Sequence, residues 1–165
     1  MSFHSVNEID KFSFEDCCLM AFVQEENGFG LELEALIVRP NNSQNTNYTE
    51  SYAGPTKAHF ADGKVLRVVK EGYRYLDAND QPIEEIPDSE LSEEEADLFL
   101  KTCKEYYLYA LELQKKEGDT FFYDFLIEVP REDVYDTEAP DTYRVEVSFT
   151  RADFTWQHYM NRVQR

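Results

Sequence analysis

The chain has 165 residues, and its 34 acidic and 16 basic side chains give a formal net charge of −18. This charge argues against nucleic acid and anionic membranes as partners, because their phosphates would be repelled. Apolar residues make up 42% of the sequence, which is too much core material for an intrinsically disordered chain. We therefore expect residues 1–165 to form a single acidic, soluble domain.

The lack of a visible targeting signal and the cysteine pattern both indicate the cytoplasm. No apolar stretch is long enough to cross a bilayer, and residues 1–8 lack the basic and apolar regions of a secretory signal. The three cysteines, Cys17, Cys18 and Cys103, are odd in number and include an adjacent pair, which bridges only with strain. We expect free thiols and a cytoplasmic protein.

Strand and turn signals dominate from residue 17 onward. Residues 17–25 are apolar and rich in strand formers, Asn27-Gly28 is a strong hairpin signal, and residues 29–38 continue as a second strand. Strict alternation in residues 31–34 indicates one buried face and one exposed face. A polar, turn-rich loop follows at residues 40–47.

Two further hairpins are expected before residue 90. They consist of residues 57–61 and 65–70 around Asp62-Gly63, and of residues 73–76 and 83–86 around a turn at residues 77–80. The last of these turns begins like a calcium-binding loop, but Pro82 stands where that loop needs glycine. A plain turn is therefore favoured over a calcium site.

A single helix is predicted near residues 92–104. Ser92 and Glu95 form a capping box, and three glutamates in the first turn favour the positive end of the helix dipole. Four apolar residues then recur at helical spacing on one face: Ala96, Phe99, Leu100 and Cys103.

The segment after this helix suits two structures. Residues 105–116 fit a continued helix or a tyrosine-rich strand, and we favour a strand that turns at Gly118-Asp119 into residues 120–129. A second acidic loop is expected at residues 130–140. Alternation in the following segment places four residues on one face: Tyr143, Val145, Val147 and Phe149.

Together these elements predict a mainly β fold of the α+β class. We expect one antiparallel β-sandwich or partly open barrel of about seven or eight strands, with the helix packed against it. The expected core consists of Phe22, Leu31, Leu33, Val65, Leu100, Val145, Val147 and Trp156. The residues expected to be exposed are Glu32, Glu34, Arg144 and Glu146.

The sequence lacks the common motifs of catalysis and cofactor binding. No phosphate-binding glycine loop occurs, and His4, His59 and His158 have no second ligand at a convincing metal-binding spacing. His59 alternates with its neighbours in an expected strand, which suits a structural role. No serine or cysteine nucleophile signature is present. We therefore expect no cofactor, no metal site and no catalytic residue.

Acidic residues gather in two clusters. Residues 83–100 hold eight carboxylates and no Lys or Arg, and residues 128–141 hold six, opposed only by Arg131. Such clusters can recognise a cationic partner, bind a divalent cation weakly in the second loop, or serve only as solvated surface. The candidate partner-binding residues are Glu84, Glu85, Asp133, Asp136, Glu138 and Asp141.

Two stretches of the sequence carry a resemblance. With residues 12–17 (FSFEDC) leading into a hairpin and residues 141–147 (DTYRVEV) leading to Trp156, the chain resembles small acidic bacterial proteins of unknown function. Its size and acidity are also similar to those of bacterial toxin-immunity proteins, which cover a basic toxin with an acidic face. The resemblance transfers no functional residue to this sequence.

Three functions are compatible with these features. The favoured one is a non-enzymatic, cytosolic protein-binding module, immunity-like in style, that binds a basic protein through its acidic surface and exposed tyrosines. The alternative is a small-molecule binder with an aromatic-lined pocket on the concave face of the sheet. The third is an acid–base hydrolase, which needs two carboxylates converging in a cleft.

Overall fold

The fold is given by a computed structural model that describes residues 2–131 and 140–164. Strands dominate these residues, which include one α-helix, so the expected mainly β class is confirmed. The expected number of strands is wrong, because sixteen form within the described residues and ten of them belong to the main sheet. Three span only two residues each, too few for alternation to reveal: β2 (Phe12–Ser13), β5 (Ile37–Val38) and β11 (Ser89–Glu90).

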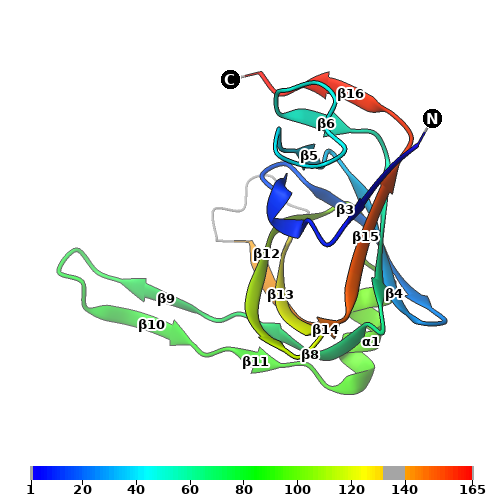
Figure 1. Cartoon of the computed structure of the whole chain (residues 1–165). Helices are drawn as coiled ribbons and strands as arrows, with labels where there is room; N and C mark the ends of the chain where they lie inside the picture. The colour runs from blue at the N-terminus through cyan, green and yellow to red at the C-terminus, as the bar shows by residue number, and fades with distance from the viewer. Residues whose placement is uncertain (1, 132–139, 165) are drawn as a thin grey trace.

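One antiparallel sheet of ten strands organises the molecule (Figure 1). In spatial order its strands are β1 (Phe3–Val6), β15 (Arg151–Trp156), β7 (Thr56–Ala61), β4 (Gly28–Glu34), β3 (Cys18–Glu25), β12 (Tyr106–Glu117), β13 (Thr120–Val129), β14 (Asp141–Phe149), β8 (Lys64–Lys70) and β11. The outer strands β1 and β11 do not pair with each other, so the sheet stays open.

Two smaller sheets accompany the main one. Near the chain ends, β16 (Tyr159–Arg162), β6 (Ser51–Ala53), β5 and β2 form a four-stranded sheet. On the other side of the molecule, β9 (Tyr73–Leu76) and β10 (Pro82–Ile86) form a two-stranded sheet that projects from the body (Figure 1).

The main sheet folds in two at a corner beside Asp62-Gly63. The hairpin expected there is wrong, because β7 pairs with β4 and β15, whereas β8 pairs with β14 and β11. The backbone amide of Thr150, which joins β14 to β15, donates to the carbonyl of Ala61 over 2.9 Å, so both chain segments bend together. A turn dipeptide fixes the sharp bend but leaves the choice of strand partner to packing. Gly63 suits this corner, because a Cβ atom there would lie 2.6 Å from the Phe29 ring.

The other three hairpins are confirmed. They are β3–β4 around Asn27-Gly28, β9–β10, and β12–β13 around Gly118-Asp119. The favoured strand after the helix is thereby confirmed as β12. Gly28 has a φ of +137°, and a Cβ atom there would lie 2.0 Å from the carbonyl oxygen of Phe60, so this turn requires glycine.

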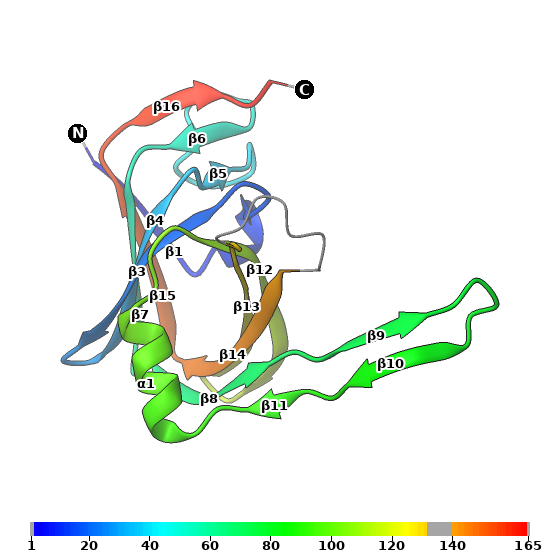
Figure 2. The same ribbon diagram turned by 180° about the vertical axis from the view of Figure 1, so that it is seen from behind.

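The helix α1 (Glu93–Lys101) begins as expected and is shorter than the predicted residues 92–104. Ser92 accepts a hydrogen bond from the Glu95 amide, and the Glu95 side chain reaches back to the Ser92 amide, which completes the capping box. The helix contacts both β3 and β8 and lies on the side of the sheet seen in Figure 2. Its Phe99 ring stacks on Tyr143 of β14 with 4.3 Å between ring centroids.

Aromatic side chains fill the space between the two halves of the folded sheet. Phe60 links them, since its ring centroid lies 4.9 Å from that of Phe29 on β4 and 4.9 Å from that of Phe149 on β14. Six members of the expected core are buried: Leu31, Leu33, Leu100, Val145, Val147 and Trp156. Phe22 and Val65 are only partly buried, because they lie at the margin of this core.

The expected exposure holds on one strand and fails on another. Glu32 and Glu34 on β4 are exposed. Arg144 and Glu146 on β14 point to the outer face as expected but are half-buried, because they lie within a cluster of ion pairs. Alternation predicts on which face of the sheet a side chain lies, but it does not show what packs over that side chain.

The three cysteines and the polar loop at residues 40–47 lie within the described structure. Cys17, Cys18 and Cys103 are free thiols, and Cys17 and Cys103 are buried. The polar loop at residues 40–47 folds onto the N-terminal segment, where the Asn42 amide donates to the Ser5 hydroxyl over 3.2 Å. Within the described residues, no helix combines the length and apolar character needed to cross a membrane.

Candidate functional site

The most distinctive surface feature is the projecting hairpin of residues 73–86, which we call the arm (Figure 1). Asp77 caps its turn, because its carboxylate accepts hydrogen bonds from the backbone amides of Asn79 and Gln81 over 2.8 and 2.9 Å. Neither arm strand pairs with a third strand among the described residues. The arm therefore offers both its faces and its edges to the surroundings.

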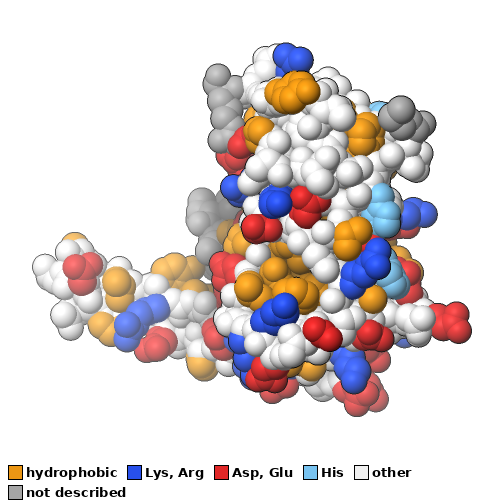
Figure 3. Space-filling view, viewed as in Figure 1, with side chains coloured by type: hydrophobic (Ala, Val, Ile, Leu, Met, Phe, Trp, Pro, Cys, Tyr) orange, Lys and Arg blue, Asp and Glu red, His pale blue; other side chains and the backbone are white. Residues whose placement is uncertain are grey.

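The arm carries apolar side chains that the body leaves uncovered. Of the twelve large hydrophobic side chains that are exposed in the described structure, five lie on the arm: Tyr73, Tyr75, Leu76, Ile83 and Ile86. Figure 3 shows hydrophobic side chains along the arm, interspersed with Asp and Glu. A two-stranded ribbon has no core in which to bury such residues, so their position favours contact with another molecule.

Tyr73 and Tyr75 form an ordered pair on one face of the arm. Their rings meet edge to face with 4.9 Å between centroids. Across the ladder, Ile86 lies opposite Tyr73 and Glu84 lies opposite Tyr75. Because side chains alternate along a strand, this face combines two aromatic rings, one aliphatic side chain and one carboxylate. Arg74 and Glu85 form an exposed ion pair of 3.7 Å on the opposite face.

Hydrogen bonds and ion pairs hold the root of the arm. The Gly72 amide donates to the Asp88 carboxylate over 2.7 Å, which joins the two segments that enter and leave the arm. The Glu71 amide donates to the Thr142 carbonyl of β14 over 2.9 Å, which joins the first of these segments to the body. Arg144 of β14 lies 3.4 Å from the Glu71 carboxylate and 3.8 Å from that of Asp88. Both strands of the arm are thus tied to one guanidinium group, which sets the direction in which the arm projects.

Arg144 also serves two carboxylates on the outer face of the sheet. Its Nε lies 3.1 Å from the Glu146 carboxylate and 4.0 Å from that of Asp124. Burial raises the pKa of Asp124, and the neighbouring charge of Glu146 raises it further. Arg67 adds a second guanidinium, 2.8 Å from Glu146. The two carboxylates that converge here are therefore bound by arginines, which favours a structural role.

The predicted site residues fall into three groups. Glu84 and Glu85 lie on β10 and are exposed on the arm. Asp141 begins β14 near the root of the arm, with its carboxylate 3.8 Å from Lys70 and 3.6 Å from Arg131. Asp133, Asp136 and Glu138 lie outside the described residues. The structure thus places two of the six on one projecting element and a third near its base.

The concave side of the main sheet is where the sequence predicts an aromatic-lined pocket. Its inner face is filled by aromatic side chains at most 1% exposed: Phe29, Phe60, Phe125, Phe149, Phe154 and Trp156. A small depression lined by Asn7, Ile9, Asp10, Phe121, Tyr123 and Phe149 measures about 40 Å³, which leaves room for only a few water molecules.

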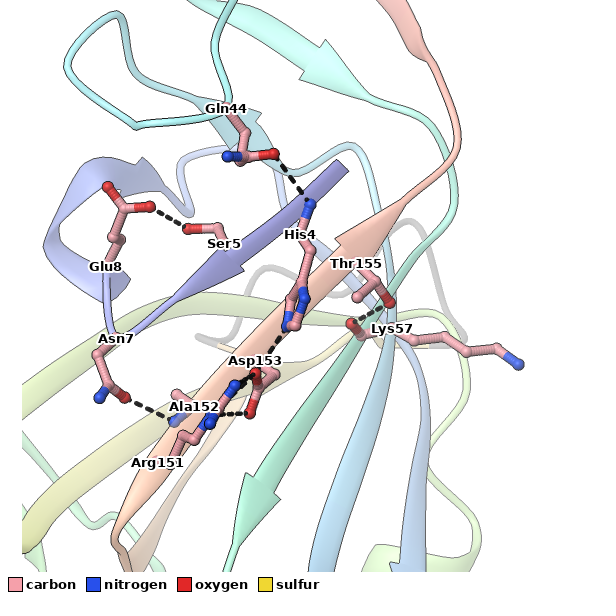
Figure 4. A network of polar contacts seen from close by, with 10 residues as sticks. All are labelled: His4, Ser5, Asn7, Glu8, Gln44, Lys57, Arg151, Ala152, Asp153 and Thr155. Atoms are coloured by element: carbon pink, nitrogen blue, oxygen red, sulfur yellow. Dashed lines mark hydrogen bonds and ion pairs between the residues drawn. The ribbon is translucent and has the colours of Figure 1, made fainter. Parts of the chain in front are cut away.

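A polar network near the N-terminus is the clearest acid–base constellation (Figure 4). Asp153 of β15 lies 2.7 Å from His4 Nε2 and accepts a hydrogen bond from Arg151 Nε over 2.9 Å. Burial acts to raise the pKa of Asp153, but the hydrogen bonds from Arg151 and His4 outweigh it and hold the pKa below its usual value. Asn7 and Ala152 exchange two hydrogen bonds of 2.8 Å beside it. These contacts fasten the outer strand β1 to β15.

His59 on β7 lies 2.8 Å from the Glu25 carboxylate of β3, a partly exposed cross-strand pair. Over residues 2–131 and 140–164, no group of three or more His, Cys, Asp and Glu is arranged to hold a metal ion.

Exposed tyrosines are expected from the sequence to take part in binding, but no tyrosine or isoleucine of the arm is among the predicted site residues. The sequence does contain a signal for an exposed hairpin, since residues 73–76 and 83–86 are two short β-prone segments and carboxylates occur both in the turn between them and in the second segment. The hairpin prediction for these segments did not show that the hairpin projects from the body. Comparison with protein-family models, curated proteins and solved structures gives no match, so the functional argument depends on the chain's own residues.

Proposed function

We propose that this protein is a non-enzymatic binding module that docks a basic protein through the arm, in the style of a cytoplasmic toxin-immunity protein. The observation that carries the proposal is the arm itself, on which exposed apolar side chains and carboxylates occur together. Exposed aromatic residues are the side chains most often responsible for binding energy at protein interfaces.

Charge supports a cationic partner. Residues 73–86 contain four carboxylates, at Asp77, Asp80, Glu84 and Glu85, and one cation, Arg74. The whole chain has a net charge of −18, so it attracts positively charged proteins over distances longer than a contact. We expect the carboxylates to speed the encounter and the tyrosine face to slow dissociation.

The anchored root of the arm also supports docking. A hydrogen bond joins Gly72 to Asp88, and an ion pair ties Asp88 to Arg144 of the main sheet. An interface that is ordered before binding loses less conformational entropy on association. A small-molecule pocket on the concave face has less support, because aromatic side chains fill that face. The hydrolase alternative also has less support, since Arg144 and Arg67 bind the converging carboxylates of Asp124 and Glu146.

The test uses a partner isolated on the immobilised protein and then purified for kinetic measurements. Replacing Tyr73 and Tyr75 together by Ser should raise the dissociation rate, with a loss of about 2–4 kcal/mol in binding free energy. Replacing Glu84 and Glu85 by Gln should mainly lower the association rate.

A matched control keeps the change in charge and moves it to another strand. Replacing Glu32 and Glu34 of β4 by Gln removes the same two charges from an exposed segment outside the arm. This variant should bind almost as the wild type does. Equal losses in both glutamine variants would show that only net charge matters, and unchanged binding in the tyrosine variant would exclude the arm as the contact surface.

A further inference from the structure

A second candidate surface lies along β8, away from the arm. On one side, β8 pairs with β14 from Lys64 to Lys70. On the other side, β11 pairs with β8 only at Val69 and Lys70, and the Leu91 amide adds one bond to the Val68 carbonyl. Residues 64–67 therefore have an edge without a strand partner in the described part of the chain. Edges of this kind accept an added strand unless something covers them.

A groove runs along this edge. Its volume is about 550 Å³, and its lining includes the six consecutive residues from Gly63 to Val68. Consecutive residues line a groove together where it follows the backbone edge of a strand, because side chains of one face would contribute only every second residue. We call this space the β8 groove.

The walls and floor of the β8 groove have distinct chemistry. Its floor is apolar and includes Phe29 and Leu100, which belong to the core. The opposite wall is the N-terminal part of α1, which contributes Glu93, Ala96 and Asp97. This wall therefore offers carboxylates above an apolar floor.

The dimensions and the hydrogen-bonding edge fit an extended chain. A strand added beside β8 would lie about 4.8 Å away, and four residues opposite Lys64–Arg67 would span about 13 Å. In such a strand, alternate side chains would meet the apolar floor and the others would meet the carboxylates of Glu93 and Asp97. Lys64, Arg67 and Glu90 also line the groove, so three carboxylates face two cations there. Because Arg67 is paired with Glu146 at 2.8 Å, the lining keeps an excess of negative charge.

We infer that the β8 groove binds an extended segment of a partner protein, in which apolar residues alternate with Lys or Arg, by adding a strand to β8. Backbone hydrogen bonds supply affinity in this mode of recognition, and the alternating side chains supply specificity. A second copy of this chain suits the groove less well, because its own exposed strand β10 carries Glu84 and Glu85. The site is separate from the arm and does not depend on it.

The probe is a library of acetylated and amidated hexapeptides in which Val, Ile, Leu or Phe alternates with Lys or Arg. We expect members that bind and that slow amide hydrogen exchange in residues 63–68. The best member, N-methylated at alternate amides, should bind at least about tenfold more weakly, because it loses the strand hydrogen bonds. A library with Glu in place of Lys and Arg should not bind.

Two tryptophan variants of α1 locate the site. Ala96→Trp fills the groove and should weaken binding of the best peptide at least about tenfold. Leu98→Trp is the matched control, because Leu98 is 64% exposed and does not line the groove. Should Ala96→Trp fail to fold, the paired change Glu93→Gln and Asp97→Asn keeps the shape of the groove. This paired change should weaken binding of the basic peptide about threefold or more, and the loss should be smaller at high salt.

Several results would overturn the inference. One is that no peptide of the library binds, and another is that the N-methylated peptide binds as tightly as its parent. The others are that the peptide slows amide hydrogen exchange in residues 73–86 instead of 63–68, and that the two tryptophan variants weaken peptide binding equally. Concentration-dependent protection of residues 63–68 in the protein alone would assign the groove to a second copy. Peptide binding that survives Tyr73→Ser and Tyr75→Ser would support the groove as a site independent of the arm.

Discussion

Replacement of Leu33 by Ala tests the packing and the register of β4 directly. Leu33 is 1% exposed at the centre of the main sheet, opposite Leu19 of β3 and Thr56 of β7. The change removes three carbon atoms, which costs about 2.4 kcal/mol at roughly 0.8 kcal/mol for each buried methylene group. The cavity left behind raises the total to about 3–4 kcal/mol. For a chain of this length, that loss lowers the melting temperature by about 6–16 °C.

Urea and thermal unfolding can be followed by fluorescence, because the single tryptophan, Trp156, is 1% exposed. Leu113→Ala is the matched control, since Leu113 is 55% exposed and should cost less than about 1 kcal/mol. Equal losses of unfolding free energy for Leu33→Ala and Leu113→Ala would refute this packing and register of β4. A shift of β4 by one residue would turn Glu32 and Glu34 inward and Leu33 outward.

Two further predictions concern thiols and acid. In the folded protein a thiol reagent should modify Cys18 before Cys17 and Cys103, because Cys18 alone is not buried. Burial raises the pKa of all three thiols, that of Cys103 to about 12. After denaturation without reductant all three thiols should react, and fewer than three reactive thiols would contradict the expectation; EDTA should leave the melting temperature unchanged. Asp153 has a pKa below the ordinary 3.8, so the stability that it contributes is present above about pH 4 and is lost as the pH falls through the lowered value. Asp153→Asn should therefore flatten the acid limb of the stability curve, and an unchanged slope would exclude this group as a cause.

Turn chemistry and alternation predicted much of the fold. Asn27-Gly28 and Gly118-Asp119 each mark a hairpin that forms, and Ser92 with Glu95 marks the start of the helix. These signals are local, since each depends on the backbone conformation of a few neighbouring residues. Local signals of this kind carry over directly from sequence to structure.

The corner at Asp62-Gly63 could not be predicted in the same way. Its residues dictate a sharp turn, but whether the flanking strands pair depends on distant segments. Here β15 and β14 supply the partners, and the ring of Phe60 packs against Phe149 on the far side of the bend. Sequence separation hides this arrangement, because it joins residues almost ninety positions apart.

The candidate site was only partly predictable for a related reason. Glu84 and Glu85 attract attention by charge alone. Tyr73 and Ile86 look like core residues, because strand-forming apolar side chains usually pack against a second layer. Nothing in the local pattern shows that the hairpin leaves the body, and the anchoring role of Arg144 at its root depends on the pairing of β14 with β8.

The most direct test of the binding proposal is the association rate of the purified basic partner at two salt concentrations. Salt of about 0.15 M screens charges beyond about 8 Å, so long-range attraction to a chain of charge −18 should weaken as salt rises. We predict that the association rate falls by about tenfold between low and high salt, and that Glu84→Gln with Glu85→Gln reduces this dependence. An association rate that does not change with salt would contradict the role proposed for the acidic arm.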